Sequence, residues 1–147
     1  MNGLGSVGDP GRRRALDTAF RARGFGFATV VHPAAVVAAD VVLDEGAQVM
    51  AGAVVQTGSR LGRGVIVNSG AVVDHDCLLG DFAHVAPGAV LSGGVEVGAD
   101  THLGTGARVI QGVRIGAGCL VAAGAVVVRD LPDGARVAGV PARGMRR

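Results

Sequence analysis

The chain has 147 residues, enough for one ordinary domain and little more. It contains 26 Gly, 26 Val and 24 Ala beside four Phe, so its interior must be built from small aliphatic side chains rather than bulky aromatic ones. The apolar share of 49% excludes a disordered chain, and the formal net charge of +2 is too small for a nucleic-acid-binding surface.

The sequence also limits where the protein is expected to be found. No uncharged apolar run reaches the roughly 18 residues that a membrane span needs. The N-terminus does not show the basic and then apolar pattern of an export signal. We therefore expect a cytoplasmic protein without membrane or nucleic-acid partners.

A short strand, a helix and a second strand are predicted for residues 1–29. Asp9-Pro10 is typical of a helix start, because proline is tolerated in the first turn, and Gly24 can end the helix. The basic cluster Arg12-Arg13-Arg14 is interpreted as a solvated face. Residues 25–31 are expected to form the second strand. An apolar stripe at helical spacing would give the helix a buried face: Ala15, Leu16, Ala19 and Phe20.

A six-residue repeat runs from Val31 to Val127. Every sixth residue in this stretch is Val, Leu or Ile, at all 17 positions, and the residue four places after each is small or β-branched. A period of six fits a short strand followed by a corner, with the small and the large aliphatic residue both pointing inward. Three such sides close a triangular coil of 18 residues. Glycines spaced by 18 are expected at its corners: Gly62, Gly80, Gly98 and Gly116.

Residues 30–130 are thus predicted to form an all-β, parallel solenoid of about five and a half coils, in which each coil packs on its neighbours. Residues 129–134 are a turn-rich exit from this solenoid. Residues 131–147 are expected to form a C-terminal tail or a short cap.

Several segments carry a more specific resemblance. The hexads resemble those of the hexapeptide-repeat acyltransferases, whose fold is a left-handed parallel β-helix. Over roughly residues 5–143 the chain looks like one branch, which contains the sialic-acid O-acetyltransferase-like enzymes and the bacterial UDP-4-amino-sugar N-acetyltransferases. The likeness lies in Val67-Asn68-Ser69-Gly70, Val73-Asp74-His75-Asp76-Cys77, His84-Val85-Ala86-Pro87-Gly88-Ala89, Leu91-Ser92-Gly93-Gly94-Val95, Gln111-Gly112-Val113, Ala123-Gly124-Ala125-Val126-Val127 and Gly139-Val140-Pro141-Ala142-Arg143.

The resemblance implies an activity and an assembly. An acetyl-CoA-dependent acyltransferase would transfer an acetyl group to an amino or hydroxy group of a sugar or nucleotide-sugar, and a homotrimer would form its active sites between adjacent prisms. Members of the branch usually begin with a complete α/β domain that binds the nucleotide-sugar. Residues 1–29 resemble the last part of such a domain, so we expect either a misplaced start codon or a different acceptor.

His75 is the candidate general base. It follows the inward-facing Val73 by two residues, at a predicted corner, and imidazole has the near-neutral pKa that acyl transfer to an amine or hydroxyl requires. The resemblance makes His75 that base and Asp76 the carboxylate that orients its ring. A solvated corner pair without chemistry is the alternative interpretation.

Gly93 lies 18 residues after His75, and so one coil above it in the same column. The resemblance assigns the N–H of this glycine to the oxyanion of the tetrahedral intermediate, beside the acyl group. The alternative is a corner glycine chosen for its backbone angles, since Gly94 follows directly.

Other candidate site residues rest on the same resemblance. His84 would contact acetyl-CoA or a neighbouring subunit's active site, Asn68 would lie near the acceptor, and Arg143 would meet a coenzyme phosphate. An interface role for His84 and a solvent-exposed Arg143 remain alternatives. His102, 18 residues after His84, is interpreted as a surface residue on the same outward face.

Two other function classes are considered. A γ-class carbonic-anhydrase-like enzyme needs three histidines on zinc, and the histidine spacing does not reproduce that family's closely spaced pair, so no metal is expected. A non-catalytic scaffold is favoured by the short N-terminal region but opposed by His75-Asp76. Cys77 and Cys119 fall in the inward column, where cysteines are usually inert, so we expect direct transfer rather than an acyl-cysteine.

Overall fold

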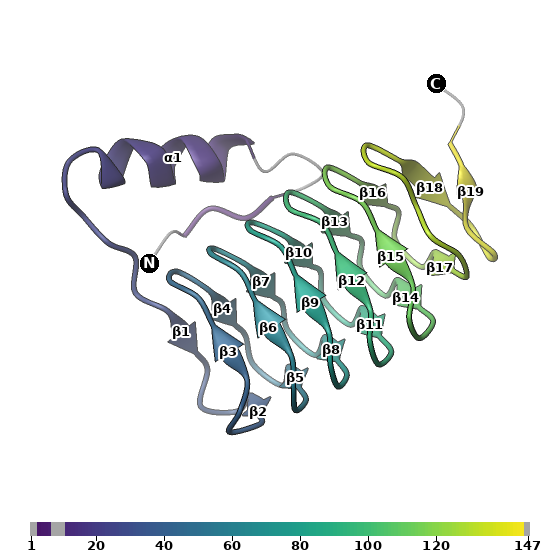
Figure 1. Cartoon of the computed structure of the whole chain (residues 1–147), viewed down its shortest axis with the longest axis horizontal. Coiled ribbons are helices and arrows are strands. Elements are labelled where there is room, and N and C mark those ends of the chain that lie inside the picture. Colours follow the sequence, from purple (N-terminus) through teal and green to yellow (C-terminus); the bar gives the residue numbers. More distant parts are fainter. Residues whose placement is uncertain (1–2, 7–10, 146–147) are drawn as a thin grey trace.

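A computed structural model describes residues 3–6 and 11–145. The chain forms a triangular solenoid, and the helix α1 (Gly11–Arg21) lies along its N-terminal half (Figure 1). Short strands stack into three sheets that run the length of the solenoid. No helix within the described residues is long and apolar enough to cross a membrane.

Each of the first five coils gives one strand to each sheet. Sheet A contains β1 (Val30–Val31), β4 (Gln48–Val49), β7 (Ile66–Val67), β10 (His84–Val85), β13 (His102–Leu103), β16 (Leu120–Val121), β18 (Arg136–Ala138) and β19 (Arg143–Gly144). Sheet B contains β2 (Val36–Val37), β5 (Val54–Val55), β8 (Val72–Val73), β11 (Val90–Leu91), β14 (Arg108–Val109) and β17 (Val126–Val127). Sheet C contains β3 (Val42–Leu43), β6 (Arg60–Leu61), β9 (Leu78–Leu79), β12 (Glu96–Val97) and β15 (Arg114–Ile115).

The pairing register confirms the 18-residue coil. Val72 pairs with Val90 in sheet B, and His84 pairs with His102 in sheet A, in parallel and without a slip. From β4 to β17, the large aliphatic of each strand and the small or β-branched residue two positions before it are both buried, as Val73 and Ala71 illustrate with no exposed surface. A thin core of Val, Leu, Ile, Ala and Cys therefore extends along the whole solenoid. The predicted parallel β-solenoid is confirmed.

The expected corner glycines are required by close packing. A Cβ built on Gly80 would lie 2.6 Å from the backbone nitrogen of Ala99 in the next coil, so no side chain fits there. Other corner positions have a positive φ, which glycine adopts without strain. Among the described residues, three positive-φ positions hold other residues: Asp76, Phe82 and Asp100.

The helix differs from its prediction in the face that it buries. Its start at Asp9-Pro10 lies outside the described residues, and it ends before Gly24, which has a φ of +81°. The predicted apolar stripe is wrong as a buried face, because Ala15, Ala19 and Phe20 are exposed and Leu16 is half-buried.

The buried helix residues are charged, Arg13 and Asp17. The solvated face inferred for the arginine cluster is wrong for Arg13, which has 1% of its surface exposed. Its guanidinium donates to the carbonyl oxygens of Gly64 and Phe82 and lies 5.8 Å from the centre of the Phe82 ring. A charged group is tolerated here because carbonyl oxygens and an aromatic face surround it.

The strand predicted over residues 25–31 is shorter than expected. It is confined to β1, because the Phe27 N–H donates to the Glu45 side chain instead of joining a sheet. At the other end, residues 131–145 form a cap. Leu131 bridges to Ile115 in sheet C, β18 pairs with β16, and the antiparallel β19 pairs with β18.

Candidate active site

The first group of site residues lies on the edge between sheets B and C, which we call the B–C edge. The turn between β8 and β9 places His75 there. The Asp74 carboxylate accepts the His75 backbone N–H at 2.8 Å, and the Asp76 N–H donates to the Thr57 carbonyl of the coil below. Asp76 has a φ of 58°, a conformation that aspartate adopts more readily than most residues.

His75 and Asp76 form a solvent-exposed dyad. The imidazole Nδ1 lies 2.8 Å from Asp76 Oδ2, and the two side chains are 57% and 71% exposed. A carboxylate accepts hydrogen bonds, so Nδ1 carries the proton and Nε2 of the neutral ring keeps a lone pair. The hydrogen bond from Asp76 raises the pKa of His75, with a further contribution from Asp74. The dyad is thus an accessible base whose ring orientation is fixed.

Gly93 makes room for the His75 ring. A Cβ on Gly93 would lie 2.5 Å from Cε1 of the imidazole, so any side chain would displace the ring. The backbone-angle explanation does not apply to Gly93, because the positive φ of this turn belongs to Gly94. Gly94 donates to the His75 carbonyl at 2.8 Å, whereas Gly93 N–H donates no hydrogen bond within the described residues.

The second group lies on sheet A, on another side of the prism. His84 is buried beneath residues 3–6, where its Nδ1 lies 2.9 Å from both Oγ and the carbonyl oxygen of Ser6. Its Nε2 lies 3.2 Å from Nδ2 of Asn68, and its ring packs at 88° on that of His102, 4.9 Å away. Burial, followed by the proximity of His102, lowers the pKa of His84 to about 4.

The site residues predicted from the sequence do not all lie together, because some belong to the first group and some to the second. The structure brings His75, Asp76 and Gly93 together, and places Asn68 against His84 rather than against His75. Arg143 lies in the cap, where its Nη1 donates to the Ala142 carbonyl and its side chain is exposed. Cys77 and Cys119 are buried, and burial raises the pKa of both thiols, so neither suits nucleophilic attack.

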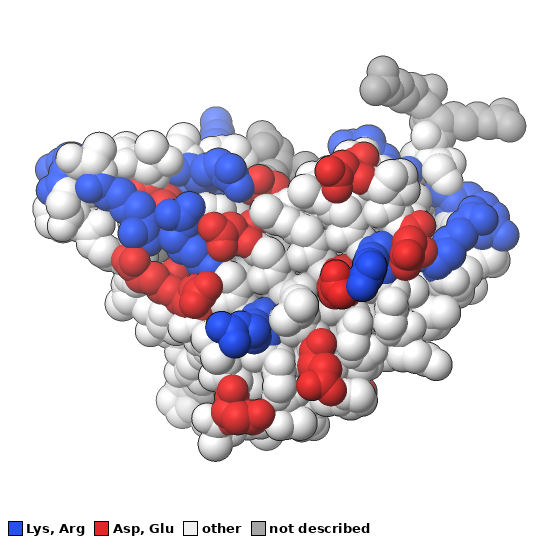
Figure 2. Space-filling view, in the orientation of Figure 1, with Lys and Arg blue, Asp and Glu red and all other residues white. Residues whose placement is uncertain are grey.

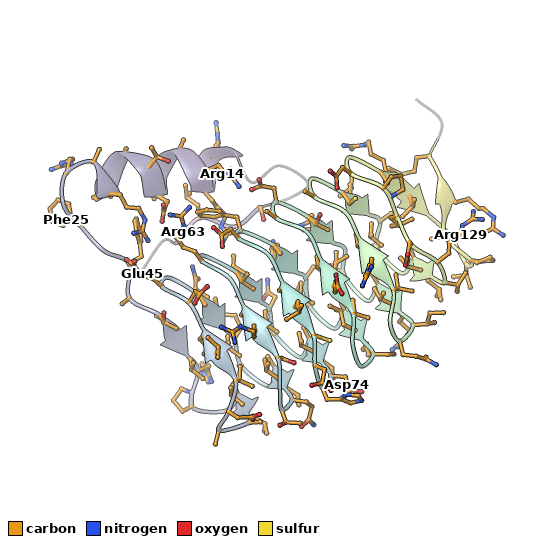
Figure 3. All side chains as sticks on the ribbon, viewed as in Figure 1. Arg14, Phe25, Glu45, Arg63, Asp74 and Arg129 are labelled. Atoms are coloured by element: carbon orange, nitrogen blue, oxygen red, sulfur yellow. The ribbon has the colours of Figure 1, made fainter. Side chains whose placement is uncertain are left out.

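Sequence reasoning missed two residues. Ser6 carries no signal, because it lies 78 residues from His84 and outside the repeat. Arg129 could have been found, because it follows His75 by three coils of 18 residues and continues the His75–Gly93–Gln111 column. Figure 3 labels Asp74 on the lower edge of the solenoid and Arg129 at its C-terminal end.

A groove of about 940 Å³ lies on the outer face of sheet C. Figure 2 shows this face, where basic and acidic side chains are interspersed. Its lining includes Arg60, Leu78, Glu96 and Arg114, and none of the residues named in the two groups above. Within the described part of the chain, no three His, Cys, Asp or Glu side chains come together as a metal site.

Solved structures similar to this chain are known, whereas the comparisons with family models and with curated sequences found no match. A variant of GDP-perosamine N-acetyltransferase from Caulobacter crescentus, in complex with CoA and GDP-perosamine, is 48% identical with a TM-score of 0.93, covering 96% of this chain and 67% of that one. The chain belongs to the hexapeptide-repeat sugar N-acetyltransferases.

Two further structures support the assignment of this chain to the acetyltransferase family. The acetyltransferase domain of PglB from Neisseria gonorrhoeae, in complex with acetyl-CoA, is 47% identical with a TM-score of 0.91, covering 95% of this chain and 68% of that one. WeeI from Acinetobacter baumannii is 28% identical with the same TM-score, covering 95% and 68%. The predicted left-handed β-helix and the predicted acyltransferase class are confirmed. The family assignment favours an acyltransferase over the scaffold and the carbonic-anhydrase-like alternatives.

Proposed function

We propose that this acetyltransferase moves an acetyl group from acetyl-CoA to the amino group of a nucleotide-linked sugar, with His75 as general base. One observation carries the proposal: an exposed imidazole, oriented by Asp76, packs over a glycine whose N–H donates no hydrogen bond within the part of the chain that the structure describes. The Caulobacter relative was solved with CoA and GDP-perosamine, which supports both substrate classes. Acetyl-CoA is the co-substrate, and the cytoplasm is the proposed compartment.

The geometry supports direct transfer. The acceptor nitrogen attacks the thioester carbonyl while Nε2 of His75 takes its proton, and Gly93 N–H is placed to donate to the oxyanion. When the tetrahedral intermediate collapses, the C–S bond breaks and the imidazolium returns the proton to the CoA thiolate. Asp76 stabilises the imidazolium between these two steps.

The B–C edge above His75 suits the coenzyme. Arg129 lies three coils above His75, or about 14 Å at the usual strand spacing. Between them Ile110 is 40% exposed, and Val128, beside Arg129, is 41% exposed. An apolar path that ends at an arginine matches a pantetheine arm followed by phosphates. We assign Arg129 to the phosphates together with, or in place of, Arg143.

The separation of the two groups supports a homotrimer. Sheet B, which lies between them, presents an outward column of partly exposed valines: Val36, Val54, Val72, Val90 and Val126. Burying this column against a second copy under cyclic symmetry would bring the sheet A group of one protomer to the B–C edge of its neighbour. Each of three equivalent clefts would then contain His75 of one protomer and Asn68 and His84 of another.

The experiment is a substrate panel. The enzyme is supplied with acetyl-CoA and with GDP- and UDP-linked 4-amino sugars or free amino sugars. The released CoA thiol is measured, and the masses of the products are determined by mass spectrometry. We expect N-acetylation of a nucleotide-linked amino sugar and a fall of about 100-fold or more in His75→Ala, the usual contribution of a general base. His32→Ala, an exposed histidine at another corner, is the matched control. Undiminished acetylation by His75→Ala would overturn the proposal.

A further inference from the structure

The hydrogen bonds around His84 define its tautomer. The Ser6 carbonyl oxygen can only accept, so Nδ1 of His84 carries the proton. Nε2 of the neutral ring is then an acceptor, and the group beside it is the donor Nδ2 of Asn68. The amide orientation is independently fixed, because Asn68 Oδ1 accepts the Ser69 N–H at 2.8 Å. His84 is therefore held as a neutral acceptor that orients Asn68.

In this arrangement one N–H of the Asn68 side-chain amide remains available as a hydrogen-bond donor. Its amide nitrogen carries two hydrogens, and one of them meets His84. No other partner for this nitrogen is present in the described residues. Asn68 is half-buried at the end of β7, so its second N–H can donate to a carbonyl oxygen of a bound molecule.

His102 lies directly against His84 in the next coil. The two residues are register partners, and their rings meet edge to face at 4.9 Å. The neighbours of this pair in the same outward column are aliphatic, Ile66 before His84 and Leu120 after His102. Nδ1 of His102 is buried and has no hydrogen-bond partner within the described residues. A buried ring nitrogen without a partner lowers stability, so packing alone would favour an apolar residue at this position.

We propose that His102 is a positioning residue for acetyl transfer: its ring holds His84 against Ser6, and His84 in turn holds the Asn68 amide toward the thioester carbonyl of the acyl donor. His102 touches neither substrate in this scheme. The proposal rests on the proposed function for the identity of the acyl donor, and on the hydrogen-bond network alone for the positioning of His84.

The first test is spectroscopic and does not need a substrate. The ring nitrogens of the four histidines are assigned by long-range proton–nitrogen correlation in labelled protein, at neutral pH. We expect a single Nδ1–H tautomer for His84 in the wild type and in His102→Phe, which keeps a ring at the same place. His102→Ala should give a mixture of both tautomers, and His32→Ala should change nothing at His84.

The second test is kinetic. His102→Ala should lower kcat by about tenfold with a smaller change in the KM for acetyl-CoA, because the donor is misplaced rather than removed. His102→Phe should stay within about twofold of the wild type. Thermal unfolding is measured on both variants to confirm an intact solenoid.

The two tests separate the possible failures. If His102→Ala keeps both the wild-type tautomer of His84 and the wild-type kcat, His102 is not a positioning residue. If the tautomer changes while kcat does not, His84 and Asn68 do not act in the transfer and the proposal fails at that step. A wild-type enzyme that acetylates no member of the panel overturns the proposed function, and the spectra then still decide whether His102 positions His84.

Discussion

His75 depends on one neighbour in the sequence and one neighbour in the next coil. Asp76 holds its Nδ1 and raises its pKa, and Gly93 provides the space that its ring occupies. The two contacts have different consequences, because the first sets the proton affinity of the base and the second sets its position. They can therefore be tested separately.

Asp76→Asn should change the pH dependence of acetyl transfer. A general base acts when it is unprotonated, so a raised pKa of His75 places the acidic limb of kcat/KM at a higher pH than an ordinary imidazole would. Removing the carboxylate lowers that pKa, so the limb should move to lower pH. The plateau should fall as well, because the imidazolium loses its partner.

The control for this pH profile is Asp44→Asn, an exposed carboxylate at another corner. It should leave both the limb and the plateau in place. A profile for Asp76→Asn that coincides with that of the wild type would show that the dyad does not set the proton affinity of the base.

Gly93→Ala should lower turnover without unfolding the protein. The new methyl group would occupy the space of the His75 ring, and φ at this position is already one that alanine adopts. We expect a loss of about 100-fold in kcat, as for other small displacements of a catalytic group. Gly144→Ala makes the same change in open space and should keep full activity. Circular dichroism and kcat are measured side by side, and equal turnover in the two variants would contradict the prediction.

Sequence reasoning named residues of both groups, but it predicted the contacts of the first group only. The 18-residue period places Gly93 above His75, and the structure reproduces this adjacency through Gly94, which donates to the His75 carbonyl. The contact between Ser6 and His84 could not be predicted, because it joins the repeat to a segment that has no period. The period likewise says nothing about the ring orientation of His102.

At the scale of elements, α1 shows how a single corner residue can override a hydrophobic pattern. Phe82 occupies a corner where the coil before it has Gly64 and the coil after it has Asp100, and its ring lies over Gly64. Arg13, Arg14 and Arg63 lie within 5.2–5.8 Å of the ring centre. Figure 3 shows Arg14 and Arg63 between the helix and the solenoid. The helix thus turns its arginine side inward, and the apolar stripe read from the sequence remains outside.

Arg13→Ala should loosen this helix. The change removes hydrogen bonds to two carbonyl oxygens and leaves them buried, at a cost of about 1–3 kcal/mol in the free energy of unfolding. Denaturant unfolding measures the loss, and amide exchange over residues 11–21 locates it. Arg12→Ala, on the exposed side of the same helix, should change neither quantity. Equal effects of the two substitutions would show that Arg13 does not anchor α1.

At the scale of the whole molecule, the outer faces of the three sheets differ in character. Sheet A is partly covered by residues 3–6 and α1, sheet C carries interspersed charges, and sheet B carries a column of valines interrupted by Arg108. The repeat of inward-facing aliphatic residues was enough to predict the 18-residue coil from the sequence. The outward pattern is harder to interpret, because an exposed valine in a strand is common whether or not a partner covers it.

Val90→Arg should convert the proposed trimer to monomers. A charged side chain in the middle of the valine column would be buried without a partner at the interface. Sedimentation velocity should show a loss of about two thirds of the mass and circular dichroism should be unchanged, while acetyl transfer should be lost. Leu78→Arg, a comparable change on sheet C where the residue is 44% exposed, should remain trimeric and active. A Val90→Arg protein that sediments like the wild type would exclude sheet B as the interface.

Residues 131–145 give the molecule a definite length. A stack of parallel coils ends in unpaired backbone groups, which could template another chain and extend into a fibre. Here Gly139 accepts from the Val126 N–H and Ala142 donates to the Val126 carbonyl above sheet B, while Leu131 closes sheet C. Above sheet A, β19 runs against the direction of winding. A second solenoid therefore cannot pair its first coil with this end in a continuous winding. The cap in this way opposes end-to-end polymerisation of a repetitive sequence.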